Sequence, residues 1–581
     1  MRTMKFTLMF VMICSCHWAS AQLQSQFDTL TYNARMNGSI DSIDISTADY
    51  GTTFDGGVSL ISANGLSTDF LFENYTSPTF QPKTSWQRMQ FSALPHLGFS
   101  YSFGGQGAQF LKAEYQQAFS DSLNLNLKYN RRSGVGSVRN SIFTRNNIQG
   151  QLQKLGEFYS FKLKGNYFSA NTNHSNGLLE IDSKIESLGL EFITVRKANA
   201  SSINKIGNVE LENFFDVLKG NNKTALGLYT RHAYSINNRV YVEDSDTLNQ
   251  LYPALNIDTL STRDQFNIAS VSNGAGLFFF TKKLYGDIAL NHRYYDYQNL
   301  GTHNYINEYN VTSQVSVNFK TVEVVNDLHV NLSGAFNEFS EKLKINADFG
   351  KLNFQSMLSL ENRASFITQR NFFGNAAMYS NASSELQRFN RAKVKLSYEF
   401  TESIDVALFG DYNQISSRYA YDFSQGQWDY NNVPVAFSRI GVSSKLNFGI
   451  LNIHPRIIYS NDATSYLPEF QGSARVFLKG RLFKAKKLEA VVGFDFNYLS
   501  SYKLKLYIPY MDTYDWTSVN SSSSEGFNTS AFISLGISEF RFFFRYENFS
   551  YLWSDKESSV IQNYTIPEAR MRIGITWDFF N

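Results

Sequence analysis

The chain has 581 residues, of which 51 are Phe and 34 are Tyr, while charged residues make up only 18%. Its 53 basic and 51 acidic residues nearly balance, which argues against nucleic acid as a partner. Both cysteines, Cys14 and Cys16, lie near the N-terminus, so the remainder of the chain excludes disulfides, thiolate nucleophiles and Cys-ligated metals.

Residues 1–21 have the features of an export signal. Two basic residues precede an apolar run, Phe6–Cys14, that is too short to span a membrane as a helix. A small-x-small cleavage site, Ala19–Ala21, follows this run, so we predict that the mature chain begins at Gln22. A lipoprotein signal ending at Cys16 is the competing interpretation.

The mature sequence begins with a polar, acidic stretch and continues as a series of strand patterns. Residues 22–65 show weak periodicity, and we expect them to form a short N-terminal extension. From about residue 66, runs of apolar side chains alternate with polar ones; Leu123, Leu125 and Leu127 are an example. Because side chains alternate faces along a strand, each run predicts a strand with one apolar face.

Tight turns join some of these strands, and long polar stretches join others. The tight turns fall at positions such as 120–121, 350–351 and 538–539. The long polar stretches are residues 132–142, 170–185, 236–264, 362–388, 415–436 and 499–525. Short turns at one end and long loops at the other are typical of membrane β-barrels.

The last strand gives the clearest pattern. One face carries only apolar side chains and runs to the C-terminus, and the other face is polar or small. The apolar face consists of Met571, Ile573, Ile575, Trp577 and Phe579, and the other of Arg570, Arg572, Gly574, Thr576 and Asp578. A soluble protein rarely leaves such a strand exposed, because it invites aggregation, whereas a membrane barrel needs lipid outside and water inside.

These patterns predict an all-β fold, a closed antiparallel transmembrane β-barrel of about 16–24 strands. We expect the barrel to occupy residues 66–581, with the extension 22–65 on the periplasmic side. A soluble multi-domain β protein would be expected to show linkers and shifts in composition, and the sequence has none.

Several stretches resemble the outer-membrane β-barrel porins of Bacteroidota. The similar stretches are 60–66, 94–107 (LPHLGFSYSFGGQG), 117–136, 173–178, 251–278, 492–516 and the C-terminal RIGITWDFFN. The sequence departs from the family at 174–176, where the family tends to carry Glu-Asn-Gly-Gly. The resemblance implies a barrel in the cell outer membrane, with outer-membrane lipid as its surroundings, and says little about cargo.

The C-terminal strand also resembles the signal read by the barrel assembly machinery, which would then be a partner. The pattern places a polar residue, a glycine and two aromatic residues at Arg572, Gly574, Trp577 and Phe579. The chain departs from the commoner ending on Phe, since its last residue is Asn581.

Basic side chains on the predicted inner face are candidate lumen residues. They are Arg391, Lys393, Lys395, Arg541, Arg545, Arg570 and Arg572. The favoured interpretation is an ordinary porin wall, in which acidic residues such as Glu399, Asp405, Asp411 and Glu547 balance the basic charge. The alternative is an uncompensated basic ladder that favours anions, since charged rings tune selectivity.

No catalytic or metal-binding constellation stands out, and we expect no enzymatic activity and no cofactor. His174-Ser175-Asn176-Gly177 is similar to the His-x-Ser-Asn-Gly of outer-membrane phospholipase A, but here His and Ser are adjacent. Adjacent strand residues point to opposite faces, so the hydroxyl could not reach the imidazole as a nucleophile–base pair.

The sequence therefore favours a porin-like channel for passive diffusion of small polar solutes or ions. The alternatives are a plug-less TonB-type receptor and a structural or secretion-accessory barrel. About seventy mature residues precede the first clear strand, too few for a full plug domain. The oligomeric state is left open.

Overall fold

The computed structural model describes short segments near the N-terminus and most of the chain from residue 95 onward. The described residues are 28–30, 61–62, 65–66, 90–92 and 95–580, except 121, 137, 180–188, 220–224, 245–254, 282, 335–337, 365–366, 381–384, 423, 465, 486, 512, 517–524, 554–558 and 566–567. The export signal predicted at residues 1–21 lies outside them.

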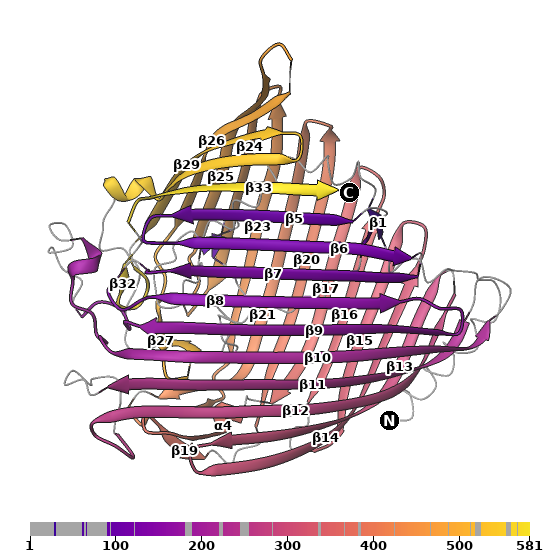
Figure 1. Cartoon of the computed structure of the whole chain (residues 1–581), viewed down its shortest axis with the longest axis vertical. Helices are drawn as coiled ribbons and strands as arrows, with labels where there is room; N and C mark the ends of the chain where they lie inside the picture. Colours follow the sequence, from indigo (N-terminus) through magenta and orange to yellow (C-terminus); the bar gives the residue numbers. More distant parts are fainter. Residues whose placement is uncertain are drawn as a thin grey trace.

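The described residues form a closed antiparallel barrel with 22 strands in its wall (Figure 1). This confirms the predicted fold, and the strand number falls within the predicted range. The first half of the wall is β5 (His96–Gly104), β6 (Gln109–Ser120), β7 (Leu123–Gly134), β8 (Phe143–Lys154), β9 (Tyr159–His174), β10 (Ala200–Lys219), β11 (Ala225–Asp244), β12 (Ser261–Phe280), β13 (Leu284–Asn299), β14 (Thr302–Asn318) and β15 (Val322–Ser333). The second half is β16 (Phe339–Asp348), β17 (Leu352–Ala364), β20 (Leu386–Thr401), β21 (Ile404–Asp422), β23 (Val435–Phe448), β24 (Leu451–Asp462), β25 (Phe470–Leu482), β26 (Leu488–Leu499), β29 (Gly526–Ile537), β30 (Phe540–Glu547) and β33 (Arg570–Phe580).

The barrel closes where its last strand pairs with its first. β33 and β5 are antiparallel, with a register that runs from Arg572 opposite Gly104 to Phe580 opposite His96. Figure 1 shows the yellow β33 beside the indigo β5. The first wall strand thus begins at His96, and the boundary near residue 66 stays a prediction because residues 67–89 lie outside the described part of the chain.

The alternation in the sequence becomes the two faces of the wall. On β33, Met571 and Trp577 are 57% and 42% exposed on the outer face, whereas Arg572 is 3% exposed on the inner face. The outer face continues across β30 and β5 in register, since Ile575 lies opposite Phe542 and Tyr101. The wall therefore presents an apolar surface outward and polar side chains inward, as expected of a membrane barrel.

The two ends of the barrel differ in their connections. Short turns such as 538–539, between β29 and β30, lie at one end of the barrel. The first wall strand, β5, begins at this end, and the last, β33, finishes there. Long connections such as 500–525, between β26 and β29, lie at the other. The predicted loop 236–264 is shorter than expected because β11 continues to Asp244. Asn238 and Asp244 interrupt the apolar face of that half, which makes its strand period harder to recognise in the sequence.

The long connections contain small elements of their own. They are η5 (Leu190–Phe192), α4 (Ile367–Arg370), β18 (Asn371–Phe373), β19 (Met378–Ser380), β22 (Gln427–Asn431), β27 (Lys505–Ile508), β28 (Thr513–Trp516), η6 (Phe549–Leu552), β31 (Ser559–Ile561) and β32 (Tyr564–Thr565). Near the N-terminus, β1 (Asp28–Leu30) pairs in parallel with β4 (Gln90–Ser92), and β2 (Ile61–Ser62) pairs with β3 (Gly65–Leu66). In the part of the chain that is described, no helix has the length and apolarity needed to cross a membrane.

Candidate functional site: the lumen and its loop core

The basic residues predicted on the last two strands lie on the inner face, and three of them form a buried cluster with two carboxylates there. Arg572 Nε lies 2.9 Å from Glu547 Oε1, and Arg570 Nε lies 2.8 Å from Glu547 Oε2. Arg545 Nη1 lies 3.0 Å from Asp495 Oδ2. All five side chains are nearly buried. In this cluster the carboxylates of Glu547 and Asp495 offset the basic charge.

Arg541 is separate from that cluster. It lies near the short-turn end of β30 and lines a recess on the inner wall together with Lys112 of β6. The four arginines of β30 and β33 thus do not act as one ladder. Three surround Glu547, and the fourth lines the recess.

The second predicted basic stripe also lies on the inner wall. On β20, Arg391 packs over the ring of Phe389, with its guanidinium carbon 5.2 Å from the ring centroid. Lys393 lies opposite Asp411 of β21 in the register, and Asp411 is bound by Arg439 at 2.5 Å. Lys395 is exposed toward the lumen. Acidic and basic side chains alternate around this part of the wall.

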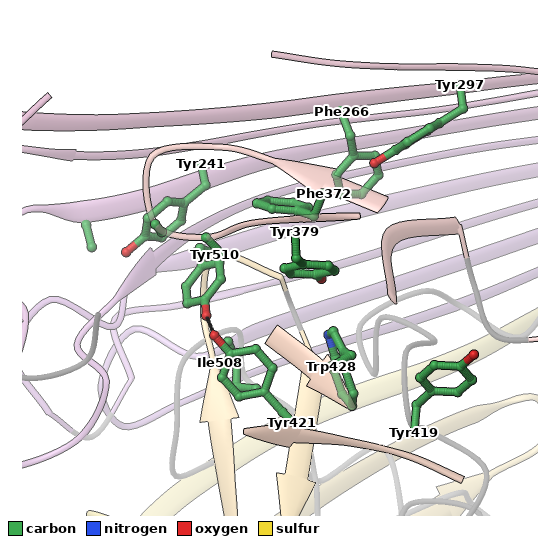
Figure 2. Close-up of a cluster of buried hydrophobic side chains, with 13 residues drawn as sticks. Tyr241, Phe266, Tyr297, Phe372, Tyr379, Tyr419, Tyr421, Trp428, Ile508 and Tyr510 are labelled. Atoms are coloured by element: carbon green, nitrogen blue, oxygen red, sulfur yellow. Dashed lines mark hydrogen bonds between the residues drawn. The ribbon is translucent and has the colours of Figure 1, made fainter. Parts of the chain in front are cut away.

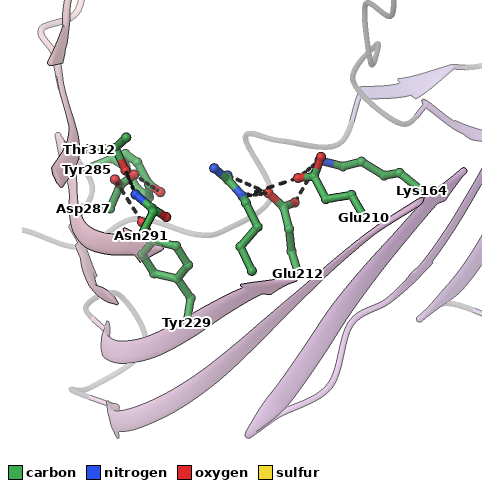
Figure 3. A network of polar contacts seen from close by, with 9 residues as sticks. Lys164, Glu210, Glu212, Tyr229, Tyr285, Asp287, Asn291 and Thr312 are labelled. Carbon is green, nitrogen blue, oxygen red and sulfur yellow. Dashed lines mark hydrogen bonds and ion pairs between the residues drawn. The ribbon is translucent and has the colours of Figure 1, made fainter. Parts of the chain in front are cut away.

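A further charged cluster spans three neighbouring strands (Figure 3). Lys164 of β9 lies 3.3 Å from Glu210 and 3.0 Å from Glu212 of β10. Arg231 of β11 donates to Glu212 Oε1 through Nη2 at 2.7 Å. The sequence interpretation missed this cluster. Its signal in the sequence is that inward-facing residues on consecutive predicted strands carry opposite charges. This signal can be recognised only once the register between the strands is known.

Beside this cluster, inward tyrosines bind a carboxylate near the short-turn end. Tyr285 donates to Asp287 at 2.7 Å, and Tyr229 approaches the same carboxylate at 3.5 Å (Figure 3). Such paired charges and hydroxyls keep the inner wall hydrophilic without leaving large isolated charges in it.

Buried side chains, most of them aromatic, form a cluster inside the barrel near the long-loop end (Figure 2). We call this cluster the loop core. Its buried members are Ala200, Tyr241, Phe266, Tyr297, Phe372, Ala376, Ala377, Tyr379, Tyr419, Tyr421, Trp428, Ile508 and Tyr510. Some come from the inner faces of β10–β13, two (Tyr419 and Tyr421) come from the end of β21, and the others come from three long connections.

The loop core crosses the barrel. Arg239 of β11 is 2% exposed and donates to the backbone carbonyls of Tyr510, at 2.5 Å, and Pro509. These carbonyls belong to the connection between β26 and β29, and several strands separate β11 from that connection in either direction around the wall. The contact therefore bridges the lumen rather than linking neighbours.

Other polar contacts anchor the connection between β17 and β20 to the wall. Asp264 of β12 accepts from the backbone N–H groups of Asn375, at 2.5 Å, and Ala376, at 3.0 Å. Tyr297 donates to the carbonyl of Asn371 at 2.7 Å. Burial raises the pKa of the Tyr379 phenol well above its ordinary value, so it stays protonated and donates to the carbonyl of Thr368.

The loop core has a weak signal in the sequence. Large aromatic residues, among them Trp428 and Tyr510, fall within stretches that otherwise read as polar loops. The sequence interpretation treated these stretches as external connections. Their aromatic content shows instead that they need a hydrophobic partner, and the inner faces of β11–β13 supply it.

The histidine of the predicted HSNG motif has a different partner from the one considered. His174 Nε2 lies 2.8 Å from the hydroxyl oxygen of Ser202 on β10, whereas the motif had suggested the adjacent Ser175 as its partner. The imidazole ring also packs against the rings of Tyr241 and Tyr507. His174 is 1% exposed. The imidazole–hydroxyl pair is therefore buried at the packed end of the lumen, and we interpret it as a structural hydrogen bond.

The residues predicted as an assembly signal lie on both faces of β33. Trp577 and Phe579 stack on the outer face with ring centroids 4.4 Å apart, and Arg572 binds Glu547 inside. Gly574 lies beneath Phe543, whose ring atoms would be 2.4 Å from a Cβ at this position. Packing alone therefore requires glycine here, and the role in assembly stays a prediction.

Among the residues that the structure describes, no group of three His, Cys, Asp or Glu side chains is arranged to hold a metal ion.

The barrel resembles the solved structures of two transporters and a receptor in fold. The FrpB iron transporter from Neisseria meningitidis superimposes with a TM-score of 0.57 at 9% identity, covering 84% of this chain and 82% of that one. The copper transporter OprC gives 0.59 at 7% identity, covering 84% and 81%. A mutant of the ferric enterobactin receptor PfeA from Pseudomonas aeruginosa gives 0.56 at 9% identity, covering 85% and 82%. At these identities the likeness shows the fold alone.

Sequence comparison identifies the family. No curated protein matches the chain. A family model with the description "Putative porin" matches residues 21–581, which include the whole wall and the loop core. The protein therefore belongs to this porin family.

Proposed function

We propose that the protein is an outer-membrane channel for small polar solutes or ions, and that the loop core gates its outer entrance. The observation that carries this proposal is the closed wall, apolar outside and lined with paired charges inside. Membership of the porin family supports it. A barrel this wide keeps an aqueous lumen unless something fills it.

The orientation follows from the two ends of the barrel. In outer-membrane barrels the short turns lie on the periplasmic side and the long loops outside. The loop core then lies at the outer entrance, and the recess beside Arg541 lies near the periplasmic end. A solute would have to pass the loop core before it reached the charged wall.

The gate is proposed because the loop core is built from separable parts. Connections from several sides of the barrel pack against the wall in this core. The hydrogen bonds of Arg239 to the connection between β26 and β29 go to backbone carbonyls, those of Pro509 and Tyr510. Loops can leave such a contact without unfolding the wall, whose backbone hydrogen bonds are independent of it.

The test is single-channel recording in planar bilayers with wild type, Arg239→Met and Arg481→Met. Met keeps the bulk of the side chain but removes its donors. Hydrogen bonds donated by a charged group would stabilise the closed state, so losing them should raise the open probability by about tenfold. Arg481 is an exposed inner-wall arginine paired with Glu489, and its replacement should leave gating unchanged.

Equal open probability in wild type and Arg239→Met would remove the gate from the proposal. Silent membranes for all three proteins, each shown by heat-modifiable mobility to be folded, would remove the channel itself.

A second candidate is a receptor that imports its solute actively. It is favoured by the filled outer end of the lumen and by the fold shared with iron and copper transporters and a ferric enterobactin receptor. Solute uptake by cells that stops when the inner-membrane proton gradient is collapsed would favour this receptor over the channel.

A further inference from the structure

Four inner-wall side chains form a row across the seam where the barrel closes. Arg541 of β30 lies opposite Thr576 of β33, Thr576 opposite Ser100 of β5, and Ser100 opposite Lys112 of β6. We call these four residues the seam row. Two cationic side chains thus flank two hydroxyl groups on adjacent strands, and the row contains no carboxylate.

The seam row lines an open recess. All four of its residues border a hollow of about 260 Å³ on the inner wall. The hydroxyl oxygens of Ser100 and Thr576 lie 3.4 Å apart at its floor. This volume is below the ~300–1,000 Å³ of pockets that hold drug-sized molecules, so the recess fits a small ligand.

The carboxylates that also border the recess already have donors. Glu114 lies 3.1 Å from Lys128 and accepts from Gln116 at 3.0 Å. Asp578 lies 3.0 Å from His96. Both carboxylates are one row nearer the short-turn end than the seam row. Their charge is partly offset. In the register, Arg541 and Lys112 are the basic side chains that flank the hydroxyl pair.

The spacing of the row suits a tetrahedral or planar anion. Neighbouring strands lie about 4.8 Å apart, so three steps separate the outer members by about 14 Å along the wall. The long Arg and Lys side chains can close much of that distance over the hydroxyls. An arginine fork, an ammonium and two hydroxyls together supply donors for several oxygens of one anion.

We propose that the seam row binds a small oxyanion of the phosphate or sulfate type. The proposal rests on the proposed function in one respect, since an anion reaches the recess through the lumen. The site faces the lumen, so its ligand is a free anion rather than a lipid headgroup on the outer surface. In a channel it would act as a selectivity site for anionic solutes.

The first experiment measures binding of inorganic phosphate to the purified, detergent-folded full-length mature protein by isothermal titration calorimetry at low salt. Four proteins are compared: wild type, the double variant Arg541→Gln with Lys112→Gln, the single variant Lys112→Arg, and Arg481→Gln. Arg481 lies outside the seam row, three strands beyond Arg541 at the same level of the wall, and pairs with Glu489 at 3.3 Å. Its replacement therefore removes a nearby charge without touching the recess.

Wild type and Arg481→Gln are expected to bind phosphate alike, and the double variant at least about tenfold more weakly. Sulfate should compete, and sodium chloride should weaken binding by screening. A variant with Lys112→Arg, which keeps the charge, should bind like wild type. Unchanged phosphate affinity in the double variant, or no saturable binding in wild type, would overturn the proposal.

The second experiment separates this site from the channel. Phosphate should reduce chloride current through wild-type protein in planar bilayers and should do so less in the double variant. Chloride current that phosphate leaves unchanged in wild type would overturn the site but leave the channel. Phosphate binding by a protein that carries no current would uphold the site and overturn the proposed channel instead.

Discussion

At the scale of single residues, the surroundings decide what each basic side chain of the last two strands does. Arg545, Arg570 and Arg572 are drawn into a buried cluster with Glu547 and Asp495. A buried ion cluster of this kind holds together only while its charges remain matched, because each unpaired ion in a low-dielectric site costs several kcal/mol.

Glu547→Gln should therefore destabilise the barrel by about 3–5 kcal/mol, since it leaves arginines crowded without their shared carboxylate. Urea unfolding of the detergent-folded protein, followed by tryptophan fluorescence, measures the change. The matched control is Glu489→Gln, which removes the same charge from an exposed pair and should cost about 0–1 kcal/mol. Equal losses in both variants would contradict the shared-carboxylate account.

Gly574 is a second residue whose identity is fixed by packing, since a Cβ there would meet the Phe543 ring and, at 2.8 Å, Ser102 Cβ. Gly574→Ala places a methyl group 2.4 Å from the Phe543 ring, so we expect a loss of about 1–3 kcal/mol of stability. Gly480→Ala is the control, because a Cβ there meets nothing within 4 Å. Adding Phe543→Leu to Gly574→Ala should recover part of the loss. No recovery would mean that the glycine serves something other than ring packing.

At the scale of elements, strands and long connections follow different rules. A wall strand such as β33 is specified by local alternation, because one face meets an apolar surrounding and the other a polar lumen. The connection that holds β18 and β19 is specified by distant partners on β12 and β13. The former can be recognised in a short window of sequence, whereas the latter cannot.

The outer face of β33 should be sensitive to charge. Trp577→Asp or Phe579→Asp is expected to reduce folded barrel in the outer membrane several-fold, since each puts a carboxylate on the lipid side and removes an aromatic residue of the predicted assembly signal. The amount of heat-modifiable protein in membrane fractions measures this. Trp577→Phe keeps the apolar face and should assemble normally. Wild-type amounts of the Asp variants would contradict both parts of the argument.

At the scale of the whole molecule, the wall is a closed cylinder. The loop core lies inside its long-loop end, and the recess lies near its short-turn end. Charge inside such a space has a stronger effect than on an open surface, because the walls confine the field. Selectivity should therefore depend on which charges face water in the lumen and not on the nearly neutral total.

Arg541→Ser should shift the reversal potential in a salt gradient toward cation preference, and Arg572→Ser should shift it less. Both variants lose one positive charge, but Arg541 lines the recess whereas Arg572 is 3% exposed against Glu547. Raising the salt concentration should reduce the difference, because the Debye length falls. Equal shifts from the two variants would show that the field follows net charge alone.

The sequence by itself determined the class of fold and the two faces of the wall. Alternation is a property of consecutive residues, so runs such as that from Met571 to Phe579 mark the outward face without knowledge of any partner. The inward direction of all seven predicted basic residues follows in the same way. The sequence bounded the strand number, but strand pairing was needed to fix it at 22.

Only the tertiary structure decided what the inside of the barrel contains. Arg239 and Tyr510 are 271 positions apart, and no local pattern relates them. Ion pairs such as Lys164 with Glu212 depend on the register between strands, and the seam row depends on the closure of the first strand on the last. These contacts form between segments that are remote in the chain, because the closed wall brings its inner faces and long connections into one confined space.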